Sequence, residues 1–193
     1  RFSANVMYDL PYGTGKAWGA NSNRYAKAVL GGWQLSAIFA VETGRALTPF
    51  WSGPDPTGTR FSPNSTRPVV TIRPDILRDP NLSNPAVDRW FDLSAFGAPQ
   101  AGSFGTSGRG AIFGAPTRVM HNSLAKYFVL HEKIRLRLEF LSTNSLNKPN
   151  YGEPDTLITN FASAGRITNV TDRNAKFDSA IPREIQALLR LEW

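Results

Sequence analysis

Two histidines occur in the chain, and one of them, His121, lies two residues before Ser123. On a β-strand this spacing places both side chains on the same side, because successive side chains point to opposite faces. A histidine that contacts a serine hydroxyl can activate it as a nucleophile for acyl transfer. The sequence has no G-x-S-x-G turn that would hold such a serine. We therefore interpret His121 and Ser123 as polar lining of a strand, and we predict that the chain is not an enzyme.

Metal and phosphate sites are equally weakly indicated by the spacing of polar residues. The separation of His121 from His131 matches no metal-binding pair, and cysteine is absent. A phosphate loop needs two glycines five positions apart and a Ser or Thr after the lysine. Gly13-Thr-Gly-Lys16 has neither feature. A group of aspartates could supply oxygen ligands to Ca²⁺, but no glycine-centred loop accompanies them; it consists of Asp75, Asp79, Asp88 and Asp92. We predict no metal and no cofactor.

Composition limits the classes of protein to which the chain can belong. It has 193 residues, a net charge of +7 and 41% hydrophobic residues, without a continuous apolar run of the length that a transmembrane helix needs. A strongly basic chain can bind nucleic acid. Here the lysines and arginines are scattered and form neither a run nor a helical stripe. We therefore predict no nucleic-acid partner and expect the positive charge to meet anionic lipids or solutes.

The last residues of the chain alternate between apolar and polar side chains, which is typical of a β-strand with one apolar face. The apolar row consists of Ile185, Ala187, Leu189, Leu191 and Trp193. The opposite row is charged or polar apart from Leu188. A soluble β-sandwich could contain such a strand, but a strand that ends the chain on an aromatic residue is more typical of a membrane β-barrel.

Four further segments alternate in the same way, and long irregular stretches separate some of them. We predict five strands near residues 2–10, 33–43, 118–130, 133–143 and 184–193. A tight turn is expected at 131–133, a short helix at Arg24–Leu30 and a short strand at Leu157–Ala162. Loops without sustained periodicity are expected at about 49–116 and 147–182. Short turns that alternate with long loops are typical of outer-membrane barrels.

Charges on the last two predicted strands lie opposite the apolar rows. Arg135, Arg137 and Glu139 share one side of the fourth strand, and charged residues of the fifth lie on the matching side. Consecutive strands usually pair. We therefore expect an interstrand ladder of charges on the face turned to the lumen of a barrel.

Five strands are too few to close a membrane barrel, and an open edge in lipid would leave backbone groups unpaired. The predicted fold class is therefore all-β: an antiparallel transmembrane β-barrel segment with long extracellular loops. We expect residues 1–193 to be the C-terminal part of a larger barrel.

Several phrases of the sequence resemble one family in their order and spacing. They are Tyr8-Asp-Leu-Pro-Tyr-Gly-Thr-Gly-Lys16, Gly31-Gly-Trp-Gln-Leu-Ser36, Thr43-Gly-Arg45, Trp90-Phe-Asp-Leu-Ser-Ala-Phe96, Phe104-Gly-Thr-Ser-Gly-Arg109, Ser123-Leu-Ala-Lys126 and Ala164-Gly-Arg-Ile-Thr168. Together they resemble the C-terminal barrel of TonB-dependent receptors of the Acidobacteria type. The chain departs from that family within Leu141–Gly152, where phenylalanines and a histidine are replaced.

The resemblance implies a location in the bacterial outer membrane and energy-dependent uptake of a solute. Barrels of this class have about 22 strands around a plug, and the family's plug contacts the TonB protein. Neither the plug nor the TonB-contacting segment is expected within this chain. The row that ends in Trp193 is similar to the signal read by the barrel-assembly machinery. The partners implied are outer-membrane lipid, that machinery and TonB.

Aromatic and charged residues in the first long loop are candidates for contact with a ligand, and a glycan is the substrate that they and the resemblance suggest. They are Trp51, Trp90, Phe91, Asp92, Phe96 and Arg109, with Phe104 nearby. The alternative is that the aromatic rings pack the loop against itself. Two other functions stay open: a soluble β-sandwich module that binds carbohydrate, and an outer-membrane adhesin or structural barrel without transport.

Overall fold

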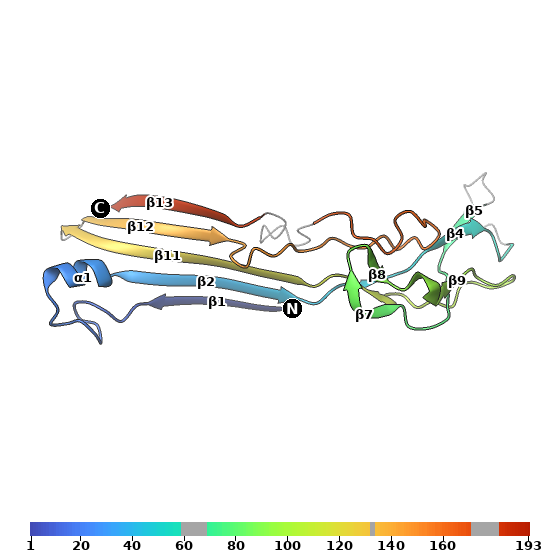
Figure 1. The fold of residues 1–193 in the computed structure, drawn as a ribbon, viewed down its shortest axis with the longest axis horizontal. Helices are drawn as coiled ribbons and strands as arrows, with labels where there is room; N and C mark the ends of the chain where they lie inside the picture. Colours follow the sequence, from blue (N-terminus) through green and yellow to red (C-terminus); the bar gives the residue numbers. More distant parts are fainter. Residues whose placement is uncertain (59–68, 132–133, 171–181) are drawn as a thin grey trace. The chain divides into compact units, whose positions relative to one another are not determined.

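The computed structural model describes residues 1–58, 69–131, 134–170 and 182–193 (Figure 1). The chain divides into two compact units. The sheet unit is the described part of Arg1–Glu42, Thr117–Pro149 and Asn174–Trp193, and the insert unit is that of Thr43–Pro116 and Asn150–Arg173. Among the described residues, no helix combines the length and hydropathy that crossing a membrane requires.

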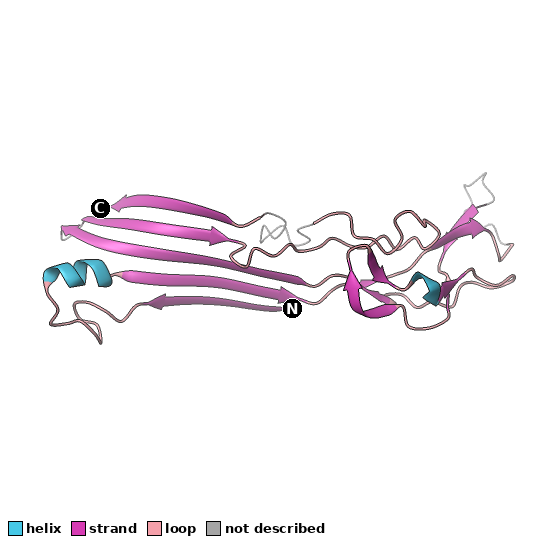
Figure 2. Cartoon of the chain, in the orientation of Figure 1, coloured by secondary structure: helices cyan, strands magenta, loops and turns pink. Residues whose placement is uncertain are grey.

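The sheet unit is built on five long antiparallel strands (Figures 1 and 2). In spatial order they are β1 (Phe2–Asp9), β2 (Trp33–Glu42), β11 (Thr117–His131), β12 (Ile134–Thr143) and β13 (Glu184–Glu192). All five predicted strands are confirmed, with ends within one residue of the predicted ones. The predicted turn at 131–133 cannot be compared in full, because residues 132 and 133 lie outside the described part of the chain.

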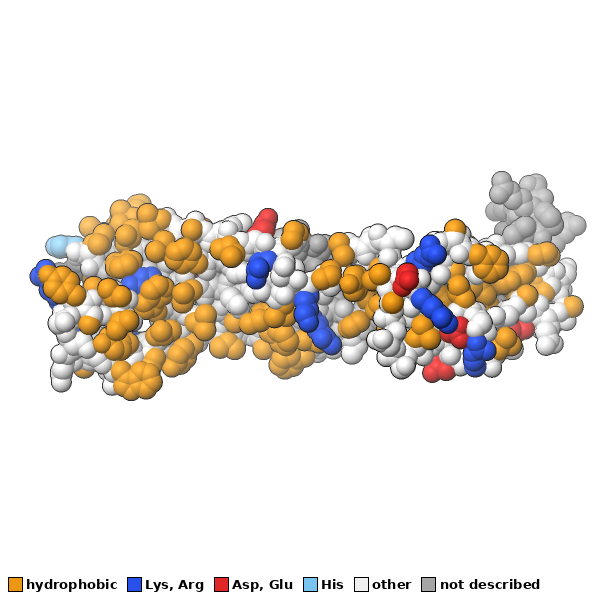
Figure 3. Space-filling view, viewed as in Figure 1, with side chains coloured by type: hydrophobic (Ala, Val, Ile, Leu, Met, Phe, Trp, Pro, Cys, Tyr) orange, Lys and Arg blue, Asp and Glu red, His pale blue; other side chains and the backbone are white. Residues whose placement is uncertain are grey.

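The register of the sheet places the apolar rows of all five strands on one face. Phe39 lies opposite Ala4 on one side and Met120 on the other. Leu138 likewise lies opposite Leu189. Because directly opposed residues on neighbouring strands point to the same side, these rows share one face. That face is apolar apart from Arg118, Asn122 and Lys126 of β11 and Ser142 of β12. Figure 3 shows hydrophobic side chains spread over the strands on the side turned to the viewer.

The opposite face is polar, but its charges are arranged differently from the predicted ladder. β12 and β13 are neighbours, as expected, and Arg137 lies opposite Arg190. Arg137 forms its ion pair at 2.9 Å with Glu139, two residues along the same strand. Arg135 lies opposite Glu192, as the ladder requires. No ion pair joins the two strands among the described residues, so the predicted ladder is present in register but not in its contacts. The register sets two arginines opposite each other, and the carboxylate two positions along β12 is the nearer partner.

The predicted short helix forms as α1 (Arg24–Leu30), just before β2, and its C-terminal end is held by a side chain of β11. The Asn23 side chain caps its first turn by accepting from the backbone N–H of Ala26 at 2.7 Å. At its other end, the Lys126 ammonium donates to the carbonyl oxygens of Val29 and Gly31. Lys126 is 2% exposed. Its charge is therefore satisfied by the carbonyl groups at the C-terminal end of the helix, where cations are favoured.

The insert unit contains short strands in place of the predicted irregular loop. They are β3 (Ala46–Leu47), β4 (Trp51–Pro54), β5 (Val69–Ile72), β6 (Asp75–Ile76), β7 (Asn81–Ala86), β8 (Arg89–Phe91), β9 (Phe96–Gly97) and β10 (Ile112–Phe113), with the 3-10 helix η1 (Leu93–Ala95). They pair as β10–β3, β4–β5, β6–β9 and β7–β8. Strands of two to six residues are too short to show a periodic pattern, which is why the sequence did not predict them.

The predicted strand at Leu157–Ala162 was wrong. Turns and one isolated bridge, from Leu157 to Phe50, occupy this stretch. The Asp155 carboxylate accepts the backbone N–H of Leu157 at 3.0 Å, and Asn160 donates to the same carboxylate at 3.3 Å. Such side-chain bonds to nearby groups favour turns over a strand. Residues 171–181 of the predicted second loop lie outside the described part of the chain.

Candidate functional site

The row predicted as an assembly signal lies on one face of β13, with Trp193 directly after its end. Leu191 lies opposite Leu136, Ala187 opposite Phe140, and Ile185 opposite Ser142. Leu189 is 69% exposed and Trp193 is 91% exposed. Within the described residues, β13 pairs with β12 alone. The row thus belongs to an edge strand whose apolar face is exposed in the part of the chain that the structure describes.

Most of the aromatic residues predicted to contact a ligand lie instead in the core of the insert unit. Phe91 and Phe96 are buried and meet edge to face, with ring centroids 6.0 Å apart. They cluster with Ile112 and Ile158. Trp51 and Trp90 are partly buried against this cluster. The indole N–H of Trp90 donates to the carbonyl oxygen of Phe113 at 2.8 Å, which fixes its ring across the unit.

Asp92, another predicted ligand contact, is at the centre of a group of polar contacts. Its carboxylate accepts from the Ser94 hydroxyl at 2.7 Å and from the Arg78 guanidinium at 2.8 Å. Arg89 approaches the other carboxylate oxygen at 3.5 Å. The Ser94 hydrogen bond, followed by that from Arg78, lowers the pKa of Asp92 to about 2. Asp92 therefore caps η1 and, as an anion at neutral pH, holds two arginines in place.

The remaining polar residues singled out in the sequence take structural positions. His121 Nδ1 accepts the backbone N–H of Asn144 at 3.3 Å. Asp75 accepts the backbone N–H of Thr106 at 2.9 Å. Asp79 accepts from the backbone and side chain of Asn81, and these hydrogen bonds, the backbone one first, lower its pKa.

Gly13 and Gly15 adopt positive φ angles of 123° and 72°, as tight turns require. The Gly13–Lys16 segment is therefore a turn, as the sequence indicated. Across the described residues, no three His, Cys, Asp or Glu side chains lie close enough together to hold a metal ion.

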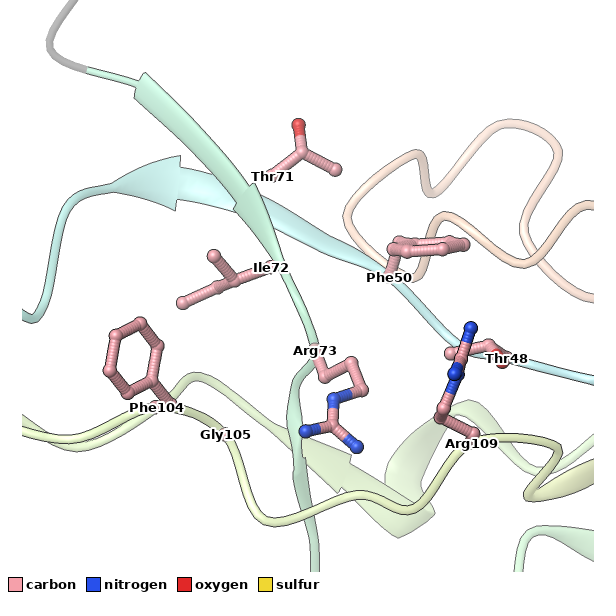
Figure 4. A pocket seen from close by; sticks show the side chains of 8 residues that line it. All are labelled: Thr48, Phe50, Thr71, Ile72, Arg73, Phe104, Gly105 and Arg109. Atoms are coloured by element: carbon pink, nitrogen blue, oxygen red, sulfur yellow. The ribbon is translucent and has the colours of Figure 1, made fainter. Parts of the chain in front are cut away.

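Arg109 lies apart from the other predicted contacts, at a cleft of about 480 Å³ in the insert unit. The side chains that line it come from segments far apart in the sequence: Thr48, Phe50, Ile72, Arg73, Phe104 and Arg109. In Figure 4, Phe104 and Ile72 lie on one side of Arg73, and Phe50 and Arg109 lie on the other. The cleft thus combines two guanidinium groups with two phenylalanine rings.

The sequence alone did not identify Phe50 and Arg73 as site residues. Each stands singly, in no motif, and the contacts that join them to Arg109 are non-local. The only sequence signal was the abundance of arginine and aromatic residues within the first long loop. Because that segment lacked predicted elements, its side chains could not be assigned to a common surface.

Comparison with known proteins finds one family. A family model described as an outer membrane beta barrel domain matches residues 1–186. No curated protein and no solved structure matches the chain.

Proposed function

The chain belongs to the outer membrane β-barrel domain family, and from this premise we propose that it is part of a TonB-dependent transporter. Membership places it in the bacterial outer membrane and removes the soluble β-sandwich as an alternative. In the proposal, the sheet unit forms part of the barrel wall. The insert unit forms the extracellular surface that solute meets before energy-coupled uptake.

The observation that carries the proposal is the contrast between the two faces of the five-stranded sheet. One face is predominantly apolar, with Arg118, Asn122 and Lys126 of β11 as its main polar positions. Residues such as Phe2, Ile185 and Leu189 are more than half exposed on it. Soluble proteins rarely expose apolar patches of this extent. The other face carries Arg137, Glu139 and further charges. Apolar residues toward lipid and polar residues toward the lumen are the arrangement of a membrane barrel.

The connections between strands support an orientation. The segments that form the insert unit follow β2 and β12, and both therefore leave the same end of the antiparallel sheet. Trp193, the last residue of β11 and the first residue of β12 lie at the other end. Long loops on barrels are extracellular and short turns are periplasmic. In the proposal, Trp193 therefore lies at the periplasmic interface and the insert unit lies outside the cell.

Transport, as opposed to adhesion or a purely structural barrel, rests on the resemblance of Tyr8–Lys16, Trp90–Phe96 and the other quoted phrases to TonB-dependent receptors. The test is chemical cross-linking in intact cells that produce the full-length protein with its natural flanking sequence. We expect a cross-linked product with TonB that is lost when the tonB gene is deleted. If the protein is folded in the outer membrane and no such product forms, the adhesin or structural reading replaces the transporter.

A further inference from the structure

The cleft in the insert unit is built on a rigid frame. The backbone N–H of Phe50 donates to Thr156 at 2.9 Å, and the Phe50 carbonyl accepts from Ile158 at 2.8 Å. Ile158 belongs to the buried core of the unit. The residue that presents one aromatic ring to the cleft is therefore held on both sides by main-chain hydrogen bonds.

The opposite wall of the cleft is held as tightly. Ser107 donates its backbone N–H to the Pro74 carbonyl at 3.0 Å, and Thr106 donates to the Asp75 carboxylate. A side chain at Gly105 would collide with the Arg73 carbonyl oxygen, so a glycine is needed for this close approach. The segment that carries Phe104 is thus packed directly against the segment that carries Arg73.

Arg109 is positioned by the next residue. The backbone N–H of Gly110 donates to the Thr48 hydroxyl at 3.1 Å, and Gly110 has a positive φ of 70°. These bonds bring Arg109 beside Thr48 and Phe50 in the cleft, as Figure 4 shows. The shape of the cleft is therefore set before any ligand arrives, which reduces the entropic cost of binding.

The charges of the cleft are not neutralised by the protein itself. Arg73 and Arg109 are exposed, and neither forms an ion pair with a carboxylate among the described residues. Other arginines of the same unit do have such partners, as Arg78 does at Asp92 and Arg45 at Glu153. Two unneutralised guanidinium groups at one preformed cleft favour an anion, because guanidinium binds carboxylate, sulfate or phosphate through parallel N–H donors.

The apolar part of the lining indicates a ligand with a ring as well as a charge. Phe50 is 41% exposed and Phe104 is 54% exposed, whereas Phe91 and Phe96 of the same unit are buried. Exposed aromatic rings beside arginines suit a ligand that has both an apolar ring face and an anionic group. The volume of the cleft lies within the range of about 300–1,000 Å³ that is usual for small-molecule sites.

We propose that this cleft binds an anionic sugar, with its acidic group between Arg73 and Arg109 and its ring against Phe50 or Phe104. The inference deepens the proposed uptake function by naming the ligand class of the insert unit. Binding itself requires neither a plug nor TonB. If the cross-linking test with TonB fails, the proposal that the cleft binds an anionic sugar still stands. If the binding test fails, the proposal that the protein is a transporter still stands.

The test measures binding to the purified full-length protein in detergent by isothermal titration calorimetry. The probes are a trigalacturonate and galactotriose, a neutral trisaccharide of similar size. We expect binding of the acidic trisaccharide, at least about tenfold weaker binding of the neutral one, and loss of affinity as salt is raised. Equal affinity for the two sugars would overturn the proposal.

Variants assign the binding to this cleft. Arg73→Gln and Arg109→Gln are each expected to weaken trigalacturonate binding by about tenfold, since each removes a charge-assisted hydrogen bond. Arg166→Gln is the matched control, because Arg166 is an exposed arginine of the same unit outside the cleft. If all three variants bind equally well, the cleft is not the site.

A competition arm distinguishes two sources of the same chemistry. Purified lipopolysaccharide, which carries acidic sugars and phosphates, is added before the trisaccharide. Binding of lipopolysaccharide without binding of trigalacturonate would assign the cleft to an anionic sugar of the membrane's own glycolipid. Binding of trigalacturonate would assign it to a free oligosaccharide. Binding of neither probe would overturn the proposal.

Discussion

The assignment of the two sheet faces makes Leu189→Arg the most informative substitution in the chain. Leu189 lies in the middle of β13 (Glu184–Glu192), on the apolar face and opposite Leu138. If that face meets lipid, an arginine there must be desolvated or must distort the bilayer. If the face instead met water, the same change would cost little, because Leu189 is already 69% exposed in this chain.

The expected magnitude follows from the position of Leu189 relative to Trp193. Trp193 is four positions after Leu189, which is about 14 Å along a strand that rises about 3.4 Å per residue. A tilt of about 45° turns this into about 10 Å of depth below an interfacial Trp193. Since the apolar band is about 25 Å tall, Leu189 lies near its middle, where arginine costs about 2–4 kcal/mol.

The matched control is Leu188→Arg, the same substitution one residue away and at nearly the same depth. Leu188 points to the polar face and lies opposite Glu139. An arginine there meets a carboxylate and the water-filled side of the barrel, so we expect the free energy of unfolding to change by less than about 1 kcal/mol. Gln186→Arg, on the same face, should be similarly mild.

The assay is urea-induced unfolding of the full-length protein in lipid vesicles, followed by its heat-modifiable mobility on gels. We expect Leu189→Arg to lower the free energy of unfolding by about 2–4 kcal/mol. Leu191→Arg lies closer to the interface and should lower it less. Equal losses for Leu188→Arg and Leu189→Arg would refute the assignment of faces, and with it the place of this sheet in a barrel wall.

Three further predictions concern separate parts of the chain. Deleting Trp193 should reduce the amount of full-length protein in the outer membrane, measured by fractionation and immunoblotting, whereas an unchanged level would contradict an assembly role for the last strand. Because the pKa of Asp92 is lowered to about 2 from 3.8, its stabilisation of the insert unit is complete above about pH 4 and is lost as the pH falls toward 2. The melting temperature should therefore fall over that range more steeply in the wild type than in Asp92→Asn. Lys126→Met removes the donor to the carbonyl oxygens at the end of α1. The rate of amide hydrogen exchange in α1 should therefore rise about tenfold. An unchanged rate would show that the contact does not hold the helix.

The long strands could be predicted from the sequence because their alternation extends over eight or more residues. Over such a length the period of two is distinct from a helical period. The same alternation also separated an apolar row from a polar row on four of the strands, and less cleanly on β11, where Arg118, Asn122 and Lys126 lie in the apolar row. The alternation did not predict the register of the strands, and the register determines which charges meet. Arg137 lies opposite Arg190, and it therefore pairs with Glu139 on its own strand.

The structure of the insert unit could not be predicted from periodicity, because the residues that form its core are far apart in the sequence. Phe91, Ile112 and Ile158 form one core, yet no repeat or spacing links them. Its strands have two to six residues, and side-chain capping by Asp92 determines the local structure as much as periodicity does. Aromatic residues in the same segment therefore have opposite roles, with Phe91 buried and Phe104 at the cleft, and composition alone cannot separate them.

The two units are stabilised in different ways, and this difference bears on where a ligand is recognised. The sheet buries little of its own apolar face, so its stability depends on lipid and on neighbouring strands. The insert unit encloses its own core, in which Phe91 and Ile112 are at most 1% exposed. A unit that is stable through its own packing can hold Phe50, Arg73 and Arg109 in fixed positions without the membrane. Because fixed side chains lose little entropy on binding, the insert unit suits the selectivity of the proposed transporter better than the sheet does.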